Sequence, residues 1–479
     1  MLALPASDPR NWFRNSFVHF MDCPHGNWWF YVWHRGYIGY LEETIRSLSE
    51  DPMFTLPYWD WTALPRIPEG MFTGALAPTD AAYAPYTKDI DTFTAFIQPS
   101  LKAYWDTLAP AQRTQLAARG YTSFDLLWND VTGFNPQTQQ IVPGNESYAE
   151  TARARFLTAG NPDLDKATAD TCSQSVIDAG LEPTEFYNED ITLSFTSTRT
   201  ATHTSMPNGS TSFSILEGQP HNHVHNYIGG VGPWDPGPYG NMTNFLSPVD
   251  PIFFLHHANM DRLWAEWTAK QQQLGLPILP TGDDLAALSN DPFLFFVRAD
   301  GSFVLDGKAG DYLSTDRFGY AYAAPTAPTP PRQVAAARKA APIKATVVSG
   351  VAAVELPAPS AAEVTRPVVV ALTLARPADS NARQFDVLVN APADVTSADV
   401  GSPYYGGSIA FFGPPMHGMA HDATFVLRLH PKARALTEQA TTRGPLKLQL
   451  RLVPHTAKAG APPTAPTAPP LKAMSARRL

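Results

Sequence analysis

Hydrophobic and polar positions follow a helical period through most of the amino-terminal part of the chain. Between residues 29 and 49, apolar side chains recur every three or four positions, which predicts a helix with one buried face. Upstream, Ser7-Asp8-Pro9 combines a capping side chain with a proline in the first turn, and this predicts the start of an earlier helix. Two more helices are predicted, one containing His221 and His225 and one that contains His257 and runs through Trp264 and Trp267. Residues 65–200 are rich in Pro, Thr, Asp and Ala, so we expect short helices and long loops there.

The pattern changes to short apolar runs bounded by turn residues after about residue 340. Such runs predict strands of a small antiparallel sandwich. The predicted strands are 368–374, 385–389, 408–412, 424–429 and 446–452. We therefore predict a mainly α domain, a helical bundle, over residues 1–322 and an all-β antiparallel sandwich domain over residues 343–455. The Pro/Ala-rich residues 323–342 are the predicted linker, and residues 456–479 are predicted to be a disordered tail.

Bulk composition excludes several classes of protein. A net charge of −9 over 479 residues argues against nucleic acid or anionic lipid as the main partner. The chain has only two cysteines, Cys23 and Cys172, so a disulfide framework is excluded and a single disulfide remains open. No apolar run approaches the ~20 residues of a membrane-spanning helix, and the first residues lack the pattern of a signal peptide. We therefore expect a cytoplasmic protein without a membrane partner.

Histidines are the candidate chemistry. His221 and His225 are four residues apart, so on a helix both imidazoles project from one face and can bind one metal ion. A third imidazole, His257 from the next helix, would complete a three-histidine site. A second group of histidines lies upstream, at positions 19, 25 and 34. Two groups of three predict a binuclear metal centre.

The imidazole ligands limit the set of candidate metals but do not identify a single one. Imidazole suits zinc, copper, iron or nickel. A catalytic zinc site usually needs one group of ligands, often with a carboxylate, so a zinc hydrolase using only the second group would leave the first unexplained. Two all-histidine groups favour a coupled pair of metals that handles dioxygen.

Two longer segments resemble a known family. HGNWWFYVWHR at 25–35, with Glu42 further along the helix, resembles the first copper-binding signature of tyrosinases, catechol oxidases and molluscan haemocyanins. DPIFFLHHANMD at 250–261 resembles the second signature. FGYAY at 318–322 resembles the Tyr-x-Tyr motif that ends the catalytic core of that family. QFDVLVN at 384–390 is similar to a segment of plant-type polyphenol oxidases, which extends the resemblance into the β domain.

This resemblance implies two copper ions, with dioxygen as co-substrate. The implied ligands are His19, His25 and His34 for copper A, and His221, His225 and His257 for copper B. His19 lies only six residues before His25, whereas the family usually has a longer loop there. His256 and His257 point about 100° apart on a helix, so only one is expected to bind metal, and the signature assigns His257. The resemblance also implies a thioether between Cys23 and His25, with a buried free thiol as the alternative.

The roles of several further residues are implied only by the resemblance to this family. Glu217 and Asn222 match residues that position a water to take the phenolic proton, and Glu217 alternatively serves as a carboxylate at a helix start. Asp261 is expected to orient an imidazole or to pair with Arg262. The residue that gates the pocket over copper B lies among three candidates: Phe245, Leu246 and Ser247.

The predicted function is that of a tyrosinase, which hydroxylates monophenols and oxidises o-diphenols to o-quinones. The alternatives are a catechol oxidase without the hydroxylation step and a haemocyanin-like oxygen carrier. The expected partners are small phenols and catechols. The resemblance implies that the β domain covers the active site until the linker is cleaved, with a purely structural domain as the alternative. His417 and Met419 in it are either copper-delivery ligands or ordinary loop residues.

Overall fold

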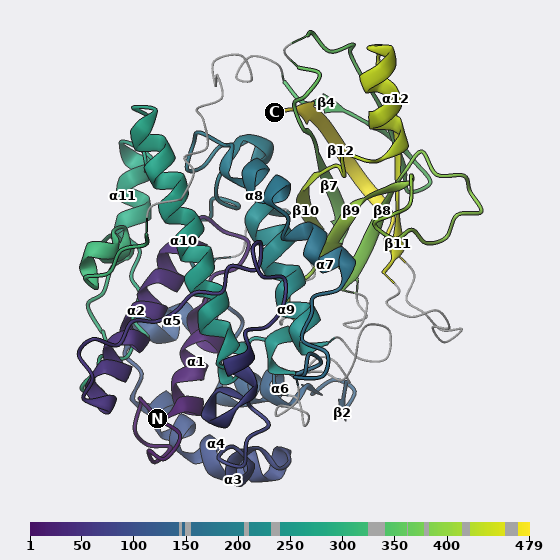
Figure 1. Ribbon diagram of the computed structural model, residues 1–479. Coiled ribbons are helices and arrows are strands. Elements are labelled where there is room, and N and C mark those ends of the chain that lie inside the picture. The colour runs from purple at the N-terminus through teal and green to yellow at the C-terminus, as the bar shows by residue number, and fades with distance from the viewer. Residues whose placement is uncertain are drawn as a thin grey trace.

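The computed structural model describes residues 1–142, 146–148, 155–205, 210–230, 240–323, 341–361, 363–377, 383–413, 422–455 and 468–479. Its helical domain and its strand-rich domain lie side by side, with α7, α8 and α9 on the side that faces the strands (Figure 1). The helices are α1 Trp12–Asp22, α2 Phe30–Ser49, α3 Ala84–Thr87, α4 Ile90–Thr107, α5 Pro110–Ala118, α6 Phe124–Thr132, α7 Lys166–Thr171, α8 Gln174–Leu181, α9 Asn222–Gly229, α10 Ile252–Gln273, α11 Asp283–Asn290 and α12 Arg434–Thr442. The strands are β1 Phe134–Asn135, β2 Gln140–Ile141, β3 Thr211–Phe213, β4 Ile343–Lys344, β5 Thr346–Val348, β6 Val351–Leu356, β7 Val368–Ala375, β8 Gln384–Val389, β9 Tyr405–Ala410, β10 Asp422–Arg428, β11 Leu446–Pro454 and β12 Leu471–Arg478.

The predicted helix at 29–49 is confirmed as α2, but the predicted start of the first helix is wrong. α1 begins at Trp12, where the side chain of Asn11 accepts hydrogen bonds from the backbone N–H groups of the first turn. The carboxylate of Asp8 instead accepts from the backbone and guanidinium of Arg10, at 2.9 and 3.0 Å. The capping side chain is therefore used in a local turn before the helix.

The β domain contains two five-stranded sheets, in the orders β3-β10-β7-β12-β4 and β5-β6-β11-β8-β9. All pairings within them are antiparallel except that of β3 with β10, which is parallel. The five predicted runs are confirmed as β7 to β11. β9, however, ends at Ala410, so Phe411 and Phe412 leave the strand. Beyond this end the side chain of Phe411 packs in the core of the β domain, whereas that of Phe412 reaches the core of the helical domain.

Two predicted boundaries of the β domain need correction. Residues 471–478, predicted to belong to a disordered tail, form β12 between β7 and β4. Leu471 and Met474 of β12 are buried in the core of the domain, and the Pro/Ala-rich surroundings hid this short apolar pattern. β3, from the middle of the helical domain, also joins this sheet. Residues 324–340 of the predicted linker and 456–467 of the tail lie outside the described residues, as do His417 and Met419.

The helical domain has a single large apolar core in which α2 and α10 pack together. Phe412 of the β domain belongs to this core, although most of its neighbours in sequence do not. Within the described residues, no helix is long and apolar enough to cross a membrane.

Candidate metal centre

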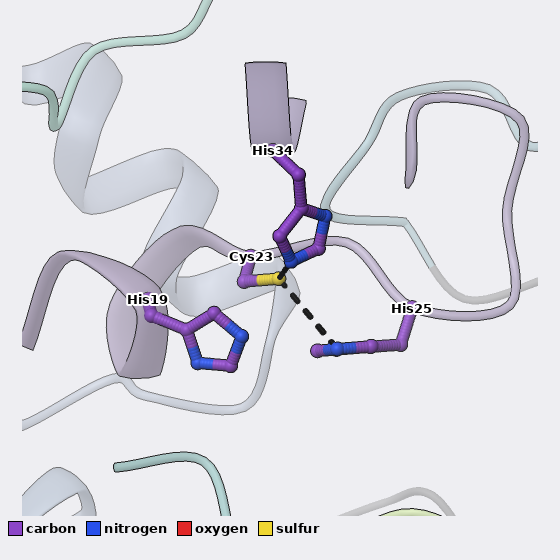
Figure 2. A group of neighbouring side chains, drawn as sticks. All are labelled: His19, Cys23, His25 and His34. Carbon is purple, nitrogen blue, oxygen red and sulfur yellow. Dashed lines mark hydrogen bonds between the residues drawn. The ribbon is translucent and has the colours of Figure 1, made fainter. Parts of the chain in front are cut away.

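The first group of histidines comes from α1, the loop after it, and α2. His19 lies in α1, Cys23 ends that helix, His25 lies in the loop and His34 lies in α2. The ring centroids of His19 and His25 are 5.3 Å apart, and each is 5.8 Å from that of His34. Figure 2 shows the three imidazoles grouped around the sulfur of Cys23. The structure thus brings His19 into the group despite its short spacing from His25.

The second group lies wholly on helices. His221 ends a π-helical turn, Glu217–His221, that runs directly into α9, which contains His225. His257 comes from α10 and lies 5.1 and 5.3 Å, between ring centroids, from the other two. His256 is buried against the same rings, 4.8 Å from His225, and neither of its nitrogens has a hydrogen-bond partner. His256 therefore belongs to the cluster, where only His257 was predicted.

The two groups face each other across one buried site. His34 of the first group stacks on His257 of the second, with ring centroids 4.0 Å apart and planes 5° apart. His25 and His221 are 5.7 Å apart on another side of the site. A site of this shape can place two metal ions next to each other.

Hydrogen bonds leave one nitrogen of several imidazoles available to a metal. The Nδ1 atoms of His19, His34 and His225 each lie 2.7 Å from a backbone carbonyl oxygen, so Nδ1–H donates and the Nε2 lone pair is left for coordination. The Nε2 atoms of His19 and His221 are buried without a partner. Such orphaned nitrogens on convergent rings are what a bound metal ion would satisfy.

Burial also sets the protonation state of these ligands. Desolvation lowers the pKa of His19 and of His221 to about 3. It lowers the pKa of His25, His34, His225 and His257 well below the usual value as well. At neutral pH the imidazoles are therefore neutral, which is the form that binds metal. Among the described residues, the first cluster contains three histidines and Cys23, and the second contains histidines alone, so neither has a carboxylate; such a donor set suits copper.

Cys23 is a free thiol in this structure. Its Sγ lies 3.7 Å from both ring nitrogens of His25 and 3.3 Å from Nε2 of His34, which are contact distances and not those of a covalent bond. Cys172 is also buried and free, so the possible disulfide between the two cysteines is absent. Burial raises the pKa of the Cys23 thiol well above its usual value.

Glu217 connects the π-helical turn of the second group to the loop of the first group by a hydrogen bond. Its Oε1 accepts a 2.6 Å hydrogen bond from the backbone N–H of Gly26, next to His25, and its Oε2 accepts a 2.5 Å bond from the hydroxyl of Ser197. Burial raises the pKa of Glu217 to about 8, although both hydrogen bonds favour the ionised form. Both carboxylate oxygens are therefore already engaged in this state of the protein.

Asn222 connects the second group to the β domain. Its Oδ1 lies 2.9 Å from Nδ1 of His221, while its Nδ2 donates to the carbonyl oxygen of Ala410 at 2.8 Å. One turn later, Asn226 donates to the carbonyl of Phe411 at 2.9 Å. The β domain thus makes hydrogen bonds to the same short helix that contains His225.

Phe412 lies directly against the metal-binding rings, a placement that sequence reasoning missed. Its ring centroid is 4.5 Å from that of His225 and 4.8 Å from that of His25. The apolar run at 408–412 predicted a strand, and nothing in it indicated that its last residue points into another domain. The aromatic ring therefore occupies the space between the two histidine groups.

Of the three gate candidates, Phe245 lies nearest to the histidine site. Its ring is 6.0 Å from His25 and 5.5 Å from Phe412, and its carbonyl accepts from His19. Phe245 thus lies on the side of the first group. Leu246 and Ser247 are fully buried.

Asp261 neither orients an imidazole nor pairs with Arg262, contrary to both expectations. Its Oδ1 accepts from Nε of Arg35 at 2.7 Å, and its Oδ2 accepts from the hydroxyls of Tyr320 and Tyr322 at 2.6 and 2.8 Å. Arg262 pairs with Glu266, and with Asp60 at 3.7 Å. Asp261 therefore fixes the Tyr-x-Tyr segment to α2, a contact over a sequence separation that local spacing does not reveal.

A helical domain in which two groups of three histidines face each other defines a binuclear metalloprotein. Residues 6–270 match the common central domain of tyrosinase. This match covers more than half of the 479-residue chain, so the chain belongs to the tyrosinase family. The family is one of polyphenol oxidases, and it implies a dicopper site at the two histidine groups.

Individual relatives agree with this assignment. The chain is 27% identical to (+)-larreatricin hydroxylase of Larrea tridentata over 345 residues, 67% of this chain and 45% of the relative. It is 26% identical to a polyphenol oxidase of Malus domestica, over 67% of this chain and 44% of that protein. The chain thus spans less than half the length of these curated relatives. The fold is similar to that of latent aurone synthase, a polyphenol oxidase, with a TM-score of 0.53 and 19% identity over 99% of this chain and 84% of that one.

The predicted cytoplasmic location is contradicted by these relatives. The proteins from Larrea tridentata and Malus domestica, and further polyphenol oxidases from Ipomoea batatas and Vicia faba, are named as chloroplastic. The cytoplasmic prediction rested on the first residues of the chain, and those residues do not determine the compartment.

Proposed function

We propose that the protein is a tyrosinase, which hydroxylates monophenols at the ortho position and oxidises o-diphenols to o-quinones with dioxygen. The observation that supports this most directly is the close approach of the two histidine groups, with His34 stacked 4.0 Å from His257. In this proposal His19, His25 and His34 hold copper A, and His221, His225 and His257 hold copper B. Copper bound there supplies the redox chemistry with dioxygen.

The protein's own residues hold and orient the ligands. Backbone carbonyls fix the rings of His19, His34 and His225, and Asn222 fixes that of His221. We assign to Asn222 and Glu217 the positioning of a water that takes the phenolic proton, because a phenol with a pKa of ~10 is barely ionised at neutral pH. Phe245 is the proposed gate, and a thioether between Cys23 and His25 is proposed to fix the His25 ring in the mature protein.

A catechol oxidase is the second candidate, and the state of Glu217 favours it. A carboxyl whose pKa is raised to about 8 is mostly protonated at neutral pH, and both of its oxygens are hydrogen-bonded, so little of it is available to accept a phenolic proton. A catechol ionises more readily than a monophenol, so diphenol oxidation depends less on such a base.

The β domain is proposed to keep this enzyme latent. The Phe412 ring takes the space between the histidine groups, and the β domain engages Asn222 through the carbonyl of Ala410. Removal of the domain by cleavage between residues 323 and 342 would open the pocket and free the side-chain amide of Asn222 from its hydrogen bond to Ala410. We accordingly expect small phenols and catechols to react only after the domain has moved.

The test is metal content together with oxygen uptake by the copper-loaded protein, before and after cleavage of the linker, with tyrosine and L-DOPA in separate runs. A tyrosinase gives two copper ions per chain and oxygen uptake on both substrates. Uptake on L-DOPA alone establishes the catechol oxidase instead. Reversible oxygen binding without turnover after cleavage contradicts both and identifies a carrier.

A further inference from the structure

Arg119 is a buried cation beside the first histidine group. It ends α5, its side chain is 6% exposed, and its Nη1 donates to the carbonyl oxygen of Cys23 at 3.0 Å. Its Nε is buried without a hydrogen-bond partner, and no carboxylate pairs with it among the residues that the structure describes. Burying a charge without a counter-charge is costly, so such a group is rarely kept without a purpose.

Arg119 faces a small cavity next to the metal site. The cavity has a volume of about 80 Å³ and is also lined by Cys23, His25 and Phe245 from the helical domain. A second cation, Arg376 of the β domain, also lines the cavity. The acidic residue in the lining, Asp422, is already paired with Lys472 at 2.5 Å. Within the described residues, the cavity therefore has an excess of positive charge.

The β domain shows what kind of group this pocket accepts. Phe412 places a phenyl ring against His25 and His225, and its backbone carbonyl accepts a hydrogen bond from Arg376 at 3.1 Å. An aromatic ring at the histidines with a guanidinium-bound oxygen a few bonds away is the pattern that an aromatic acid would reproduce. Arg376 leaves with the β domain, whereas Arg119 belongs to the helical domain and stays.

We propose that Arg119 binds the carboxylate of the substrate, so that the preferred substrates are phenols or catechols with a carboxylate on a short side chain. This inference rests on the proposed oxidation of phenols at the histidine site. The guanidinium would keep its bond to Cys23 through Nη1 and donate to the carboxylate through N–H groups that this bond leaves free. The substrate then supplies the counter-charge that the chain lacks.

A purely structural role is the competing explanation, because the bond to Cys23 also holds the loop that leads to His25. The two roles differ in what they do to charged and neutral ligands. Loss of loop anchoring weakens the binding of every aromatic ligand, while loss of carboxylate recognition weakens only the acids.

The experiment uses the full chain with Phe412→Ala, which opens the pocket, alone and combined with Arg119→Gln or Arg119→Lys. Calorimetric titration with benzoate, phenylacetate and phenylpropionate places the carboxylate at increasing distance from the ring, and the three corresponding amides are the neutral controls. We expect at least one acid to bind about 10-fold more weakly to the Arg119→Gln form, with most of the affinity restored in Arg119→Lys and no matching change for its amide.

Equal weakening of acids and amides would overturn the proposal in favour of loop anchoring. Acetate that binds as tightly as the aromatic acids would overturn it in favour of a simple anion site. On the copper-loaded protein, Arg119→Gln should weaken apparent binding of a catechol with a propionate side chain about 10-fold relative to methylcatechol, measured as the ratio of their Michaelis constants. Because the titrations need no turnover, a protein that binds the acid through Arg119 but oxidises no phenol would disprove the proposed function alone.

Discussion

The two histidine groups have equivalent ligands but are built and supported differently. The second group lies on a π turn, α9 and α10, so its ring positions follow from helical geometry. The first group takes one ligand, His25, from a loop, and that loop is held by residues distant in sequence. The second group also makes hydrogen bonds to the β domain, through Asn222 and Asn226, whereas the first meets that domain at the ring of Phe412.

This difference implies that metal binding and the proposed latency depend on different parts of the structure. Metal binding by the second group would depend on local structure, and the proposed latency would act on that group through hydrogen bonds to α9 as well as through Phe412. Metal binding by the first group depends on long-range contacts, from Glu217 to Gly26 and from Arg119 to Cys23. Changes far from the metal centre should therefore disturb the first group before the second.

The largest effect is expected on removal of a ligand from either group. His225→Ala and His25→Ala should each lower turnover by at least about 100-fold, because disturbing even the supporting contacts of a metal site costs 10- to 100-fold. Metal content should fall from two copper ions to about one in both variants. His430→Ala, which removes a histidine in the β domain, is the control and should keep both. Full activity in His25→Ala would contradict the ligand assignment of the loop.

The next effect concerns the support of the first group by His203. This buried imidazole lies between the carboxylates of Asp291 and Asp22, the latter at 2.9 Å, and Asp22 immediately precedes Cys23. Although burial opposes charge, the two carboxylates raise the pKa of His203 to about 9 from 6.5. The raised pKa is worth on the order of 3 kcal/mol of folding free energy at low pH.

The sign of the pH dependence follows from this shift. The contribution is fully present below pH 6.5, where the unfolded histidine is also protonated, and it is lost as the pH rises through about 9. Urea unfolding at pH 6, 8 and 10 should show this loss in the wild-type protein and not in His203→Asn. His203→Asn should also release copper from the first group before the second. Identical pH profiles for the two proteins would show that the imidazolium is not a support.

A smaller effect is expected from Phe412→Ala in the full chain. Truncation should raise turnover of a small catechol by about 10-fold, since the ring no longer competes with substrate, while the bond from Asn222 to the carbonyl of Ala410 remains. Tyrosine turnover should rise less than L-DOPA turnover, because Asn222 is still engaged. Oxygen uptake on both substrates, compared with linker-cleaved protein, measures the two contributions. Equal gains for the two substrates would mean that the β domain acts only by steric blocking.

The contrast between helical and loop ligands also explains which site residues the sequence could predict. Spacing alone indicated His221 and His225, because residues four apart on a helix share a face. His25 was assigned through its signature, and no periodicity places a loop residue. The sequence did not indicate the roles of Phe412 and Arg119, because these roles come from contacts between residues distant in sequence. The contacts of Asp261 with Arg35 and two tyrosines are of the same kind. The fold was predictable from periodicity except where composition hid it, as in β12.

The smallest expected effect would test the rigidity of the first group. If Cys23 and His25 become joined by a thioether when copper and oxygen are supplied, the intact mass falls by the mass of two hydrogen atoms, and Cys23→Ser prevents this loss. The variant should keep both copper ions but lose turnover by a few-fold, since the ring of His25 is still held by its loop, whose Gly26 N–H bonds Glu217. Cys172→Ser, at the other buried thiol, is the matched control and should leave the mass change intact. An unchanged mass in the active wild-type protein would show that the long-range contacts alone hold the loop.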